Sequence, residues 1–243
     1  MRTARHFINA LLLAAACLGA AAHAQEQKTE APSKQETAPA SMAPKQEAPP
    51  AKKNARPEGE QPGPAEPFDH ATPAEMSAQC VTLDTEAGAI VVEMLAEAAP
   101  ESARNFLNLA AEGAFDTTTF SRVVKDFVIQ GGNITTRETV PPELLHRASR
   151  KVPDEPNAVK HLRGVVSLAR PAEANAATTH FFILLNDAPH LDGTFAAFGR
   201  VTSGMDVVDK IAAGELDGEK PKHPVRVRRF TVARCQTPER PKQ

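Results

Sequence analysis

The sequence contains no tryptophan and only three cysteines among its 243 residues. Its 28 basic and 30 acidic side chains leave a formal net charge of −2 at pH 7, so the basic footprint of a nucleic-acid-binding protein is missing. Eight histidines are present, but they lack the spacing to cysteine or aspartate that metal ligands show, and no Ser/His/Asp order of a hydrolase is indicated. We therefore expect no metal, no small-molecule cofactor and no nucleic-acid partner.

A long apolar run lies at the N-terminus, over residues 8–22. It follows Arg2 and Arg5, is short for a membrane span, and ends at Ala22-His23-Ala24, which has the form of a signal-peptide cleavage site. We therefore predict that residues 1–24 are a signal peptide that is removed after export.

Cys17 leaves a second possibility open for the same segment. It follows Leu13-Ala14-Ala15-Ala16, which faintly resembles a bacterial lipobox, although that motif usually has a bulkier residue three positions before the cysteine. Lipidation of Cys17 would anchor the chain in the cell envelope, and a membrane would be a partner only in that case. We favour cleavage after Ala24, because the segment has the shape of a cleaved signal peptide.

Residues 25–78 have the composition of a disordered linker. Ten of the 21 prolines lie there among alanine, glutamate, lysine and glutamine, and Phe68 is the only aromatic residue. Such a stretch buries too little apolar surface to offset the loss of chain entropy. It could serve as a tether or spacer, but we favour a solvated segment with no specific partner. Residues 237–243 are expected to be a flexible tail.

Residues 79–236 are predicted to form one compact domain of mainly β structure. Strands are predicted at 81–84, 89–95, 118–124, 127–131, 164–169, 181–185, 195–201 and 225–235. Helices are predicted at 100–112 and at about 204–213, the second capped by Ser203. Because strands outnumber helices and most links are short, we expect a closed antiparallel barrel.

An arginine in a strand that should be half-buried is the most informative feature of this domain. Arg122 lies in the stretch Phe120-Ser-Arg-Val-Val-Lys-Asp-Phe-Val-Ile-Gln-Gly-Gly-Asn133. Alternation places Phe120, Arg122 and Val124 on one face. After the break at Lys125-Asp126 it places Phe127, Ile129 and Gly131 on one face, and Val128 and Gln130 on the other. A lone arginine of this kind would be interpreted as an edge residue that reaches water.

Arg122 is not alone, because this stretch resembles the catalytic strand pair of the cyclophilins, the peptidyl-prolyl cis/trans isomerases. Further blocks match the same family in order and spacing: Arg163–Arg170 with Ala177–Ile183, and His190–Val201. The resemblance covers about residues 79–236, and the run from Ala169 to His180 is most like the bacterial periplasmic branch. It implies a closed eight-stranded antiparallel barrel capped by two α-helices, and a monomeric enzyme in the periplasm.

The resemblance implies catalysis of X–Pro bond rotation in exported proteins. The partners would be Pro-containing segments of unfolded or folding exported proteins. Rotation about a peptide bond has a barrier of roughly 18–20 kcal/mol because resonance is lost, and lowering that barrier needs no nucleophile, metal or proton carrier. The rival interpretation is a catalytically weak peptide-binding or chaperone module tethered in the cell envelope. The joint presence of Arg122, Phe127 and Gln130 argues against this rival.

By the same resemblance, the catalytic residues are Arg122, Phe127 and Gln130, with Arg122 stabilising the twisted amide. The residues implied in substrate binding are Val128, Ala169, Arg170, His180, Phe182, His190, Leu191 and Phe195. Three of these depart from the family pattern: His180 replaces a glutamine, His190 the tryptophan of vertebrate members, and Phe195 a histidine. His180 could titrate near neutral pH, although we favour a neutral histidine.

The resemblance also makes Cys80 and Cys235 a candidate disulfide. They are the two cysteines left once residues 1–24 are removed, and export leads to a compartment that permits disulfides. In the family fold the first and last strands are antiparallel neighbours, which brings the start of one near the end of the other. Two free thiols slightly out of register are the alternative.

Overall fold

The computed structural model describes residues 65–236. The predicted signal peptide (1–24), with Cys17, the predicted linker up to residue 64 and the predicted tail (237–243) lie outside the described residues. None of the helices within residues 65–236 is long and apolar enough to cross a bilayer.

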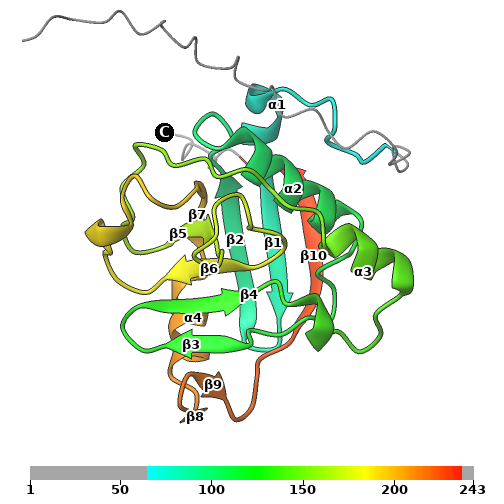
Figure 1. Cartoon of the computed structure of the whole chain (residues 1–243). Coiled ribbons are helices and arrows are strands. Elements are labelled where there is room, and N and C mark those ends of the chain that lie inside the picture. The colour runs from blue at the N-terminus through cyan, green and yellow to red at the C-terminus, as the bar shows by residue number, and fades with distance from the viewer. Residues whose placement is uncertain (1–64, 237–243) are drawn as a thin grey trace, which may run out of the picture. The chain divides into compact units, whose positions relative to one another are not determined.

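The domain is built on one antiparallel sheet of eight strands, in the order β10-β1-β2-β7-β5-β6-β4-β3 (Figure 1). In chain order, the strands are β1 (Gln79–Thr85), β2 (Gly88–Met94), β3 (Arg122–Val124), β4 (Val128–Gly131), β5 (Val165–Leu168), β6 (Phe181–Leu184), β7 (Ala197–Ser203) and β10 (Val227–Arg234). Each of the eight predicted strands corresponds to one of these, so the mainly β prediction is confirmed.

The sheet curls but does not close, so the prediction of a closed barrel is wrong. Its edge strands, β3 and β10, share no ladder, and within residues 65–236 only one isolated bridge, between Thr119 and Arg226, joins the segments beside them. With three residues, β3 is too short to complete a ladder. Its outer edge is covered instead by the hairpin of β8 (Leu216–Asp217) and β9 (Lys220–Pro221), where the Val123 N–H donates to the Glu219 carbonyl.

Within residues 65–236, four α-helices accompany the sheet: α1 (Pro73–Ser77), α2 (Pro100–Ala111), α3 (Pro142–Ala148) and α4 (Met205–Ala212). The two predicted helices are α2 and α4. The predicted Ser203 cap is wrong, because Ser203 ends β7 and Gly204 is the N-cap, with φ of 89°. Only glycine suits this position, since an added Cβ would lie 2.2 Å from the Ala89 carbonyl oxygen.

The domain begins earlier than predicted, because residues 65–78 are folded and are not linker. Thr72 and Glu75 form a capping box at the start of α1, and Met76 is fully buried. Arg104 of α2 donates to the carbonyl oxygens of Phe68 and Ala71. The proline- and alanine-rich composition concealed this short packed segment.

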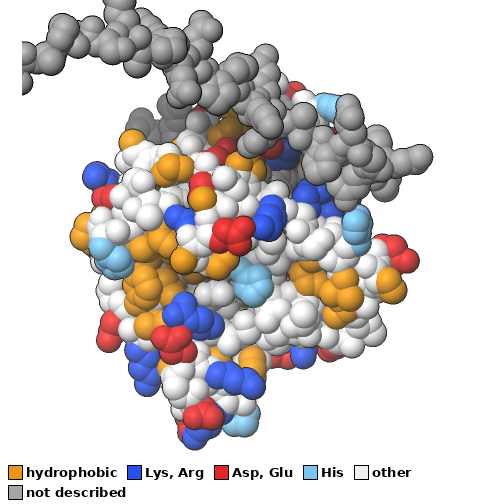
Figure 2. Space-filling model, viewed as in Figure 1, with side chains coloured by type: hydrophobic (Ala, Val, Ile, Leu, Met, Phe, Trp, Pro, Cys, Tyr) orange, Lys and Arg blue, Asp and Glu red, His pale blue; other side chains and the backbone are white. Residues whose placement is uncertain are grey.

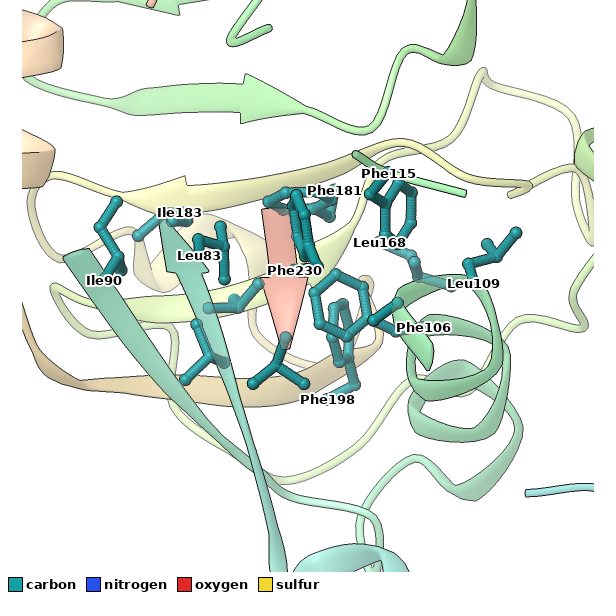
Figure 3. Close-up of a cluster of buried hydrophobic side chains, with 14 of the residues drawn as sticks. Leu83, Ile90, Phe106, Leu109, Phe115, Leu168, Phe181, Ile183, Phe198 and Phe230 are labelled. Carbon is teal, nitrogen blue, oxygen red and sulfur yellow. The ribbon is translucent and has the colours of Figure 1, made fainter. Parts of the chain in front are cut away.

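The main hydrophobic core lies between α2 and the sheet and is built around phenylalanines (Figure 3). The ring of Phe106 lies 4.9 Å from that of Phe198 and 5.2 Å from that of Phe181, measured between centroids. The Phe115 and Phe230 rings lie 5.0 Å apart. Because Phe181 of β6 points into this core, the next residue of the strand points to the other face of the sheet.

At one edge of the sheet, a disulfide joins Cys80 of β1 to Cys235, just after the neighbouring strand β10, and the two Cα atoms lie 4.8 Å apart. Cys80 lies in β1, which pairs with β10 in antiparallel register, and the Cys235 N–H donates to the Ala78 carbonyl just beyond the ladder. The bridge therefore joins the start of the first long strand to the end of the last.

Candidate active site

A second hydrophobic cluster, the outer cluster, lies on the opposite face of β4, β5 and β6 from the main core. Its buried members are Val128, Val165, Phe182, Leu184, Ala188, Leu191 and Ala197. Its partly buried members are Val124, Phe127, Val159, Ala169 and Phe195. Six residues implied by the family resemblance therefore gather here: Phe127, Val128, Ala169, Phe182, Leu191 and Phe195. In Figure 2, hydrophobic side chains are exposed over the ends of β4 and β6, beside basic and acidic side chains.

Phe127 reaches the outer cluster because it lies in the turn before β4 and not in the strand. Asp126 has φ of 62°, and the Phe127 N–H donates to the Val124 carbonyl. The alternation that grouped Phe127 with Ile129 is therefore wrong. The grouping of Phe120 with Arg122 is wrong for a similar reason, because β3 begins at Arg122 and Phe120 is fully buried in the main core.

A polar chain runs along one side of the outer cluster, from Glu219 through Arg122 and Gln130 to His180. The Arg122 Nε lies 2.6 Å from the Glu219 Oε2, and the Arg122 Nη1 lies 3.3 Å from the Gln130 Oε1. The Gln130 Nε2 lies 3.3 Å from the His180 Nδ1. Strand register sets up the centre of this chain, because Arg122 of β3 is the direct partner of Gln130 of β4.

Arg122 keeps hydrogen-bonding capacity for a ligand. The guanidinium has five N–H donors, and its Nη2 group makes no hydrogen bond to any residue in the described part of the chain. The side chain is 42% exposed, so this group can meet a substrate carbonyl from solvent. Gln130 and Glu219 hold the plane of the guanidinium in place.

His180 is held neutral by its surroundings. Burial lowers the pKa of His180 below its ordinary value. The Gln130 Oε1 accepts from Arg122, which turns the Gln130 amide NH₂ toward the His180 Nδ1, so this nitrogen must accept. Protonation at Nδ1 would set two donors against each other. The neutral form with the proton on Nε2 is therefore the form that completes the chain.

We predict that kcat/KM for a prolyl peptide is constant from about pH 8 down to about pH 6.5. The lowered pKa means that His180 gains a proton only below the ordinary histidine range, where the contact with Gln130 is lost and activity falls. A pH–rate profile measures this, and a His180→Gln variant should lack the acidic fall. An inflection above about pH 7 that disappears in this variant would contradict the assignment.

The far side of the outer cluster is formed by Arg170 and Phe195. The Arg170 guanidinium carbon lies 5.2 Å from the centre of the Phe195 ring, and the Arg170 Nε lies 3.4 Å from the Asp154 Oδ1. Phe195 meets Phe182 edge-on, with ring centroids 5.8 Å apart. His190 is exposed and is not one of the buried members of the outer cluster. The centroid of its ring lies 5.6 Å from that of Phe127.

Three residues that the sequence did not indicate, His161, Ser167 and Asp192, support the site through hydrogen bonds to one another. The His161 Nδ1 lies 3.2 Å from the Asp192 Oδ1, and its Nε2 lies 3.1 Å from the Ser167 Oγ. This has Ser/His/Asp geometry, but Ser167 is fully buried and cannot act on a substrate. The three residues instead connect β5 to the segment that carries Leu191. Burial lowers the pKa of His161 despite the neighbouring carboxylate.

Glu219 was missed as well. It comes from the β8–β9 hairpin, 97 residues from Arg122, and no local pattern marks it. The same holds for Asp192, 31 residues from His161.

The curled sheet with its arginine-bearing edge defines a cyclophilin-like fold. A cyclophilin type peptidyl-prolyl cis-trans isomerase of Cryptosporidium parvum has this fold, with a TM-score of 0.55 and 24% identity over 63% of this chain and 98% of that chain. The family model described as Cyclophilin type peptidyl-prolyl cis-trans isomerase/CLD matches residues 80–232. The chain therefore belongs to the cyclophilin family of peptidyl-prolyl cis-trans isomerases.

Curated relatives come from several kingdoms. A peptidyl-prolyl cis-trans isomerase of Arabidopsis thaliana, CYP18-2, is 37% identical over 155 residues, which are 63% of this chain and 92% of that protein. Peptidyl-prolyl cis-trans isomerase A of Dickeya dadantii is 33% identical over 149 residues, 58% of this chain and 75% of that protein.

Proposed function

We propose that this isomerase accelerates X–Pro bond rotation in exported proteins while they fold in the periplasm. The observation that carries the proposal is the Nη2 group of Arg122, which makes no hydrogen bond within residues 65–236, on a strand that borders an apolar cluster of partly exposed side chains. Metal, nucleophile and redox group are not needed, because the reaction breaks and forms no covalent bond.

Each part of the site has a role in the reaction. Phe127, Phe182 and Leu191 accept the proline ring, which loses contact with water there. Arg122 donates to the twisted prolyl amide, whose nitrogen or carbonyl oxygen gains electron density as resonance is lost. Donors already aimed at the place where charge develops contribute a few kcal/mol to such reactions. Gln130 binds substrate backbone and holds the guanidinium, and the main chain at Ala169 and Arg170 pairs with the peptide.

Location in the periplasm is supported by the N-terminal segment and by the disulfide. Residues 1–24 combine Arg2, Arg5, an apolar run and the Ala22-His23-Ala24 site. A Cys80–Cys235 bridge suits an oxidising compartment. Intact-mass measurement of the exported protein separates the two forms, because cleavage after Ala24 leaves Gln25 at the N-terminus, whereas an envelope lipoprotein would begin at a lipid-modified Cys17.

A protease-coupled prolyl assay on the full chain tests the activity. An Ala-Pro peptide is a suitable probe, since the Cryptosporidium parvum relative was solved in the presence of the dipeptide Ala-Pro. Uncatalysed exchange takes tens of seconds or longer, and catalytic amounts of the chain should shorten it to seconds. Peptide binding without acceleration would favour the binding module tethered in the envelope.

A further inference from the structure

The two arginines of the candidate site are used in opposite ways. The Nη2 group of Arg122 makes no hydrogen bond within residues 65–236, whereas all three guanidinium nitrogens of Arg170 have a protein partner. A guanidinium that is engaged on every nitrogen is held in one place and has fewer donors left for a substrate. We propose that Arg170 is a positioning residue whose side chain clamps Phe195 and so fixes the far side of the outer cluster. This inference rests on the proposed function.

Arg170 connects three segments of the chain. It lies in the loop between β5 and β6, and its Nε lies 3.4 Å from the Oδ1 of Asp154, in the segment between α3 and β5. Its Nη2 donates to the carbonyl oxygen of Thr194, just before β7, at 3.4 Å. Its Nη1 donates to the carbonyl oxygen of the next residue, Pro171, at 3.2 Å. The guanidinium therefore ties its own loop to both of the other segments.

Phe195 is held by the guanidinium and by a second ring. The guanidinium carbon of Arg170 lies 5.2 Å from the centre of the Phe195 ring, and Phe195 meets Phe182 edge-on. The N–H groups of Thr194 and Phe195 both donate to the Leu191 carbonyl, which fixes the backbone of this turn. Because Phe195 is only partly buried, its ring would gain freedom if the guanidinium were removed. Arg170 therefore acts on the outer cluster through Phe195.

Asp154 anchors the clamp and neutralises its charge. The side chains of Arg170 and Asp154 are only 18% and 20% exposed, so the ion pair is mostly shielded from water. The Asp154 N–H donates to the Asn175 Oδ1, and Val152 pairs with Ala177 in an isolated bridge, which holds this segment in place. Since the carboxylate offsets the charge of the guanidinium, the clamp itself should not distinguish acidic from basic peptides.

Steady-state kinetics of the full chain on a prolyl peptide tests the proposal. Arg170→Ala should raise KM about fivefold and leave kcat nearly unchanged, because the loosened wall weakens binding of the ground state and the transition state alike. Arg170→Lys should recover part of the loss, since lysine keeps a cation near Phe195 but cannot reach Asp154 and Thr194 together. Asp154→Asn removes the charge of the anchor and should raise KM less than Arg170→Ala does.

Arg228→Ala is the matched control. Arg228 of β10 also has an ion pair, with Asp84, and donates to a carbonyl oxygen, that of Thr85. It belongs to neither hydrophobic cluster, so its replacement should leave KM and kcat unchanged. The circular dichroism spectrum of each variant reports the fold.

A double-mutant cycle shows whether Arg170 acts through Phe195. Phe195→Leu removes the ring, and in that chain Arg170→Ala should have little further effect on KM. Three peptides that differ only in carrying glutamate, alanine or lysine after the proline give a second readout. Arg170→Ala should raise KM by the same factor for all three. A direct contact with the substrate would instead give the largest loss with the glutamate peptide and would persist without Phe195.

The outcomes separate this inference from the proposed function. If the chain turns over the peptides but the Arg170→Ala effect is absent, depends on peptide charge or persists in the Phe195→Leu chain, the inference is overturned and the proposed function stands. If Arg170→Ala does not fold, Arg170→Lys and Asp154→Asn must raise KM and must lose that effect without the Phe195 ring. A wild-type chain without activity on all three peptides would overturn both, since no reaction would remain for Arg170 to support.

Discussion

Replacing Arg122 with alanine should lower kcat/KM for a prolyl peptide by at least tenfold, and by about 100-fold if the loss matches that of a single oxyanion-hole donor. The variant removes the charge aimed at the twisted amide. The fold should survive, because the side chain is 42% exposed and belongs to neither hydrophobic cluster. The protease-coupled assay gives the rate, and the circular dichroism spectrum reports the fold.

Two matched variants show what the guanidinium contributes. Arg122→Lys keeps the charge but lacks the planar fork that reaches Gln130 and Glu219 together, so it should recover only part of the activity. Glu219→Gln keeps an acceptor near the Arg122 Nε. It should lower kcat/KM less than Arg122→Ala or Arg122→Lys does, since an exposed ion pair of this kind contributes little to holding the guanidinium in place. Wild-type kcat/KM in a correctly folded Arg122→Ala chain would show that the mechanism is wrong.

The strands were predictable because their signal is local. Alternation and turn residues located all eight strands of the sheet to within a few residues. Closure could not be predicted in this way, because it depends on how far β3 extends toward β10. That extent is limited by the β8–β9 hairpin, whose Glu219 carbonyl takes the N–H of Val123. A contact between segments so far apart in sequence leaves no local pattern.

The start of the domain shows a different limit. Composition identifies a segment that is poor in apolar residues, but it averages over many positions. Met76 alone fills a fully buried position, and Thr72 with Glu75 caps a helix of only five residues. Such a short element is overlooked when the window is long.

The candidate site divides along the same line. Arg122 and Gln130 were predictable as a pair, since the family pattern names both and β3 and β4 are neighbouring strands joined by a tight turn. Glu219, Ser167 and Asp192 could not be found, because only the fold brings them to Arg122 and His161. Phe127 lies against the outer cluster, but the alternation oriented it wrongly, since alternation fails where Asp126 adopts a positive φ.

β6 links stability to function through adjacent residues. Phe181 packs against Phe106, Phe115 and Phe230 in the main core, whereas Phe182 packs against Phe195 in the outer cluster. A substitution that shifts β6 to relieve the core would therefore move the candidate proline-binding surface. Substitutions in the main core next to β6 should therefore lower kcat/KM more than they disturb the overall fold.

Removing the Cys80–Cys235 bridge should cost about 5 kcal/mol of stability, because the bridge closes a loop with a sequence separation of 155 residues. The cross-link lowers the conformational entropy of the unfolded chain far more than that of the folded chain. For a domain of this size the loss corresponds to a fall in Tm of roughly 10–20 °C. Thermal unfolding of Cys80→Ser, Cys235→Ser and the double variant, each purified from the periplasm, measures this.

The three variants should have the same Tm, because either single change already removes the whole cross-link. Reductant should lower the Tm of the wild-type chain to the same value and should leave the variants unchanged. Intact-mass measurement with and without reduction before alkylation gives the state of the thiols directly. Two free thiols in the unreduced protein, expressed in a bacterial periplasm, would contradict the bridge, and the folded state would then depend on the phenylalanine core and the sheet ladders alone.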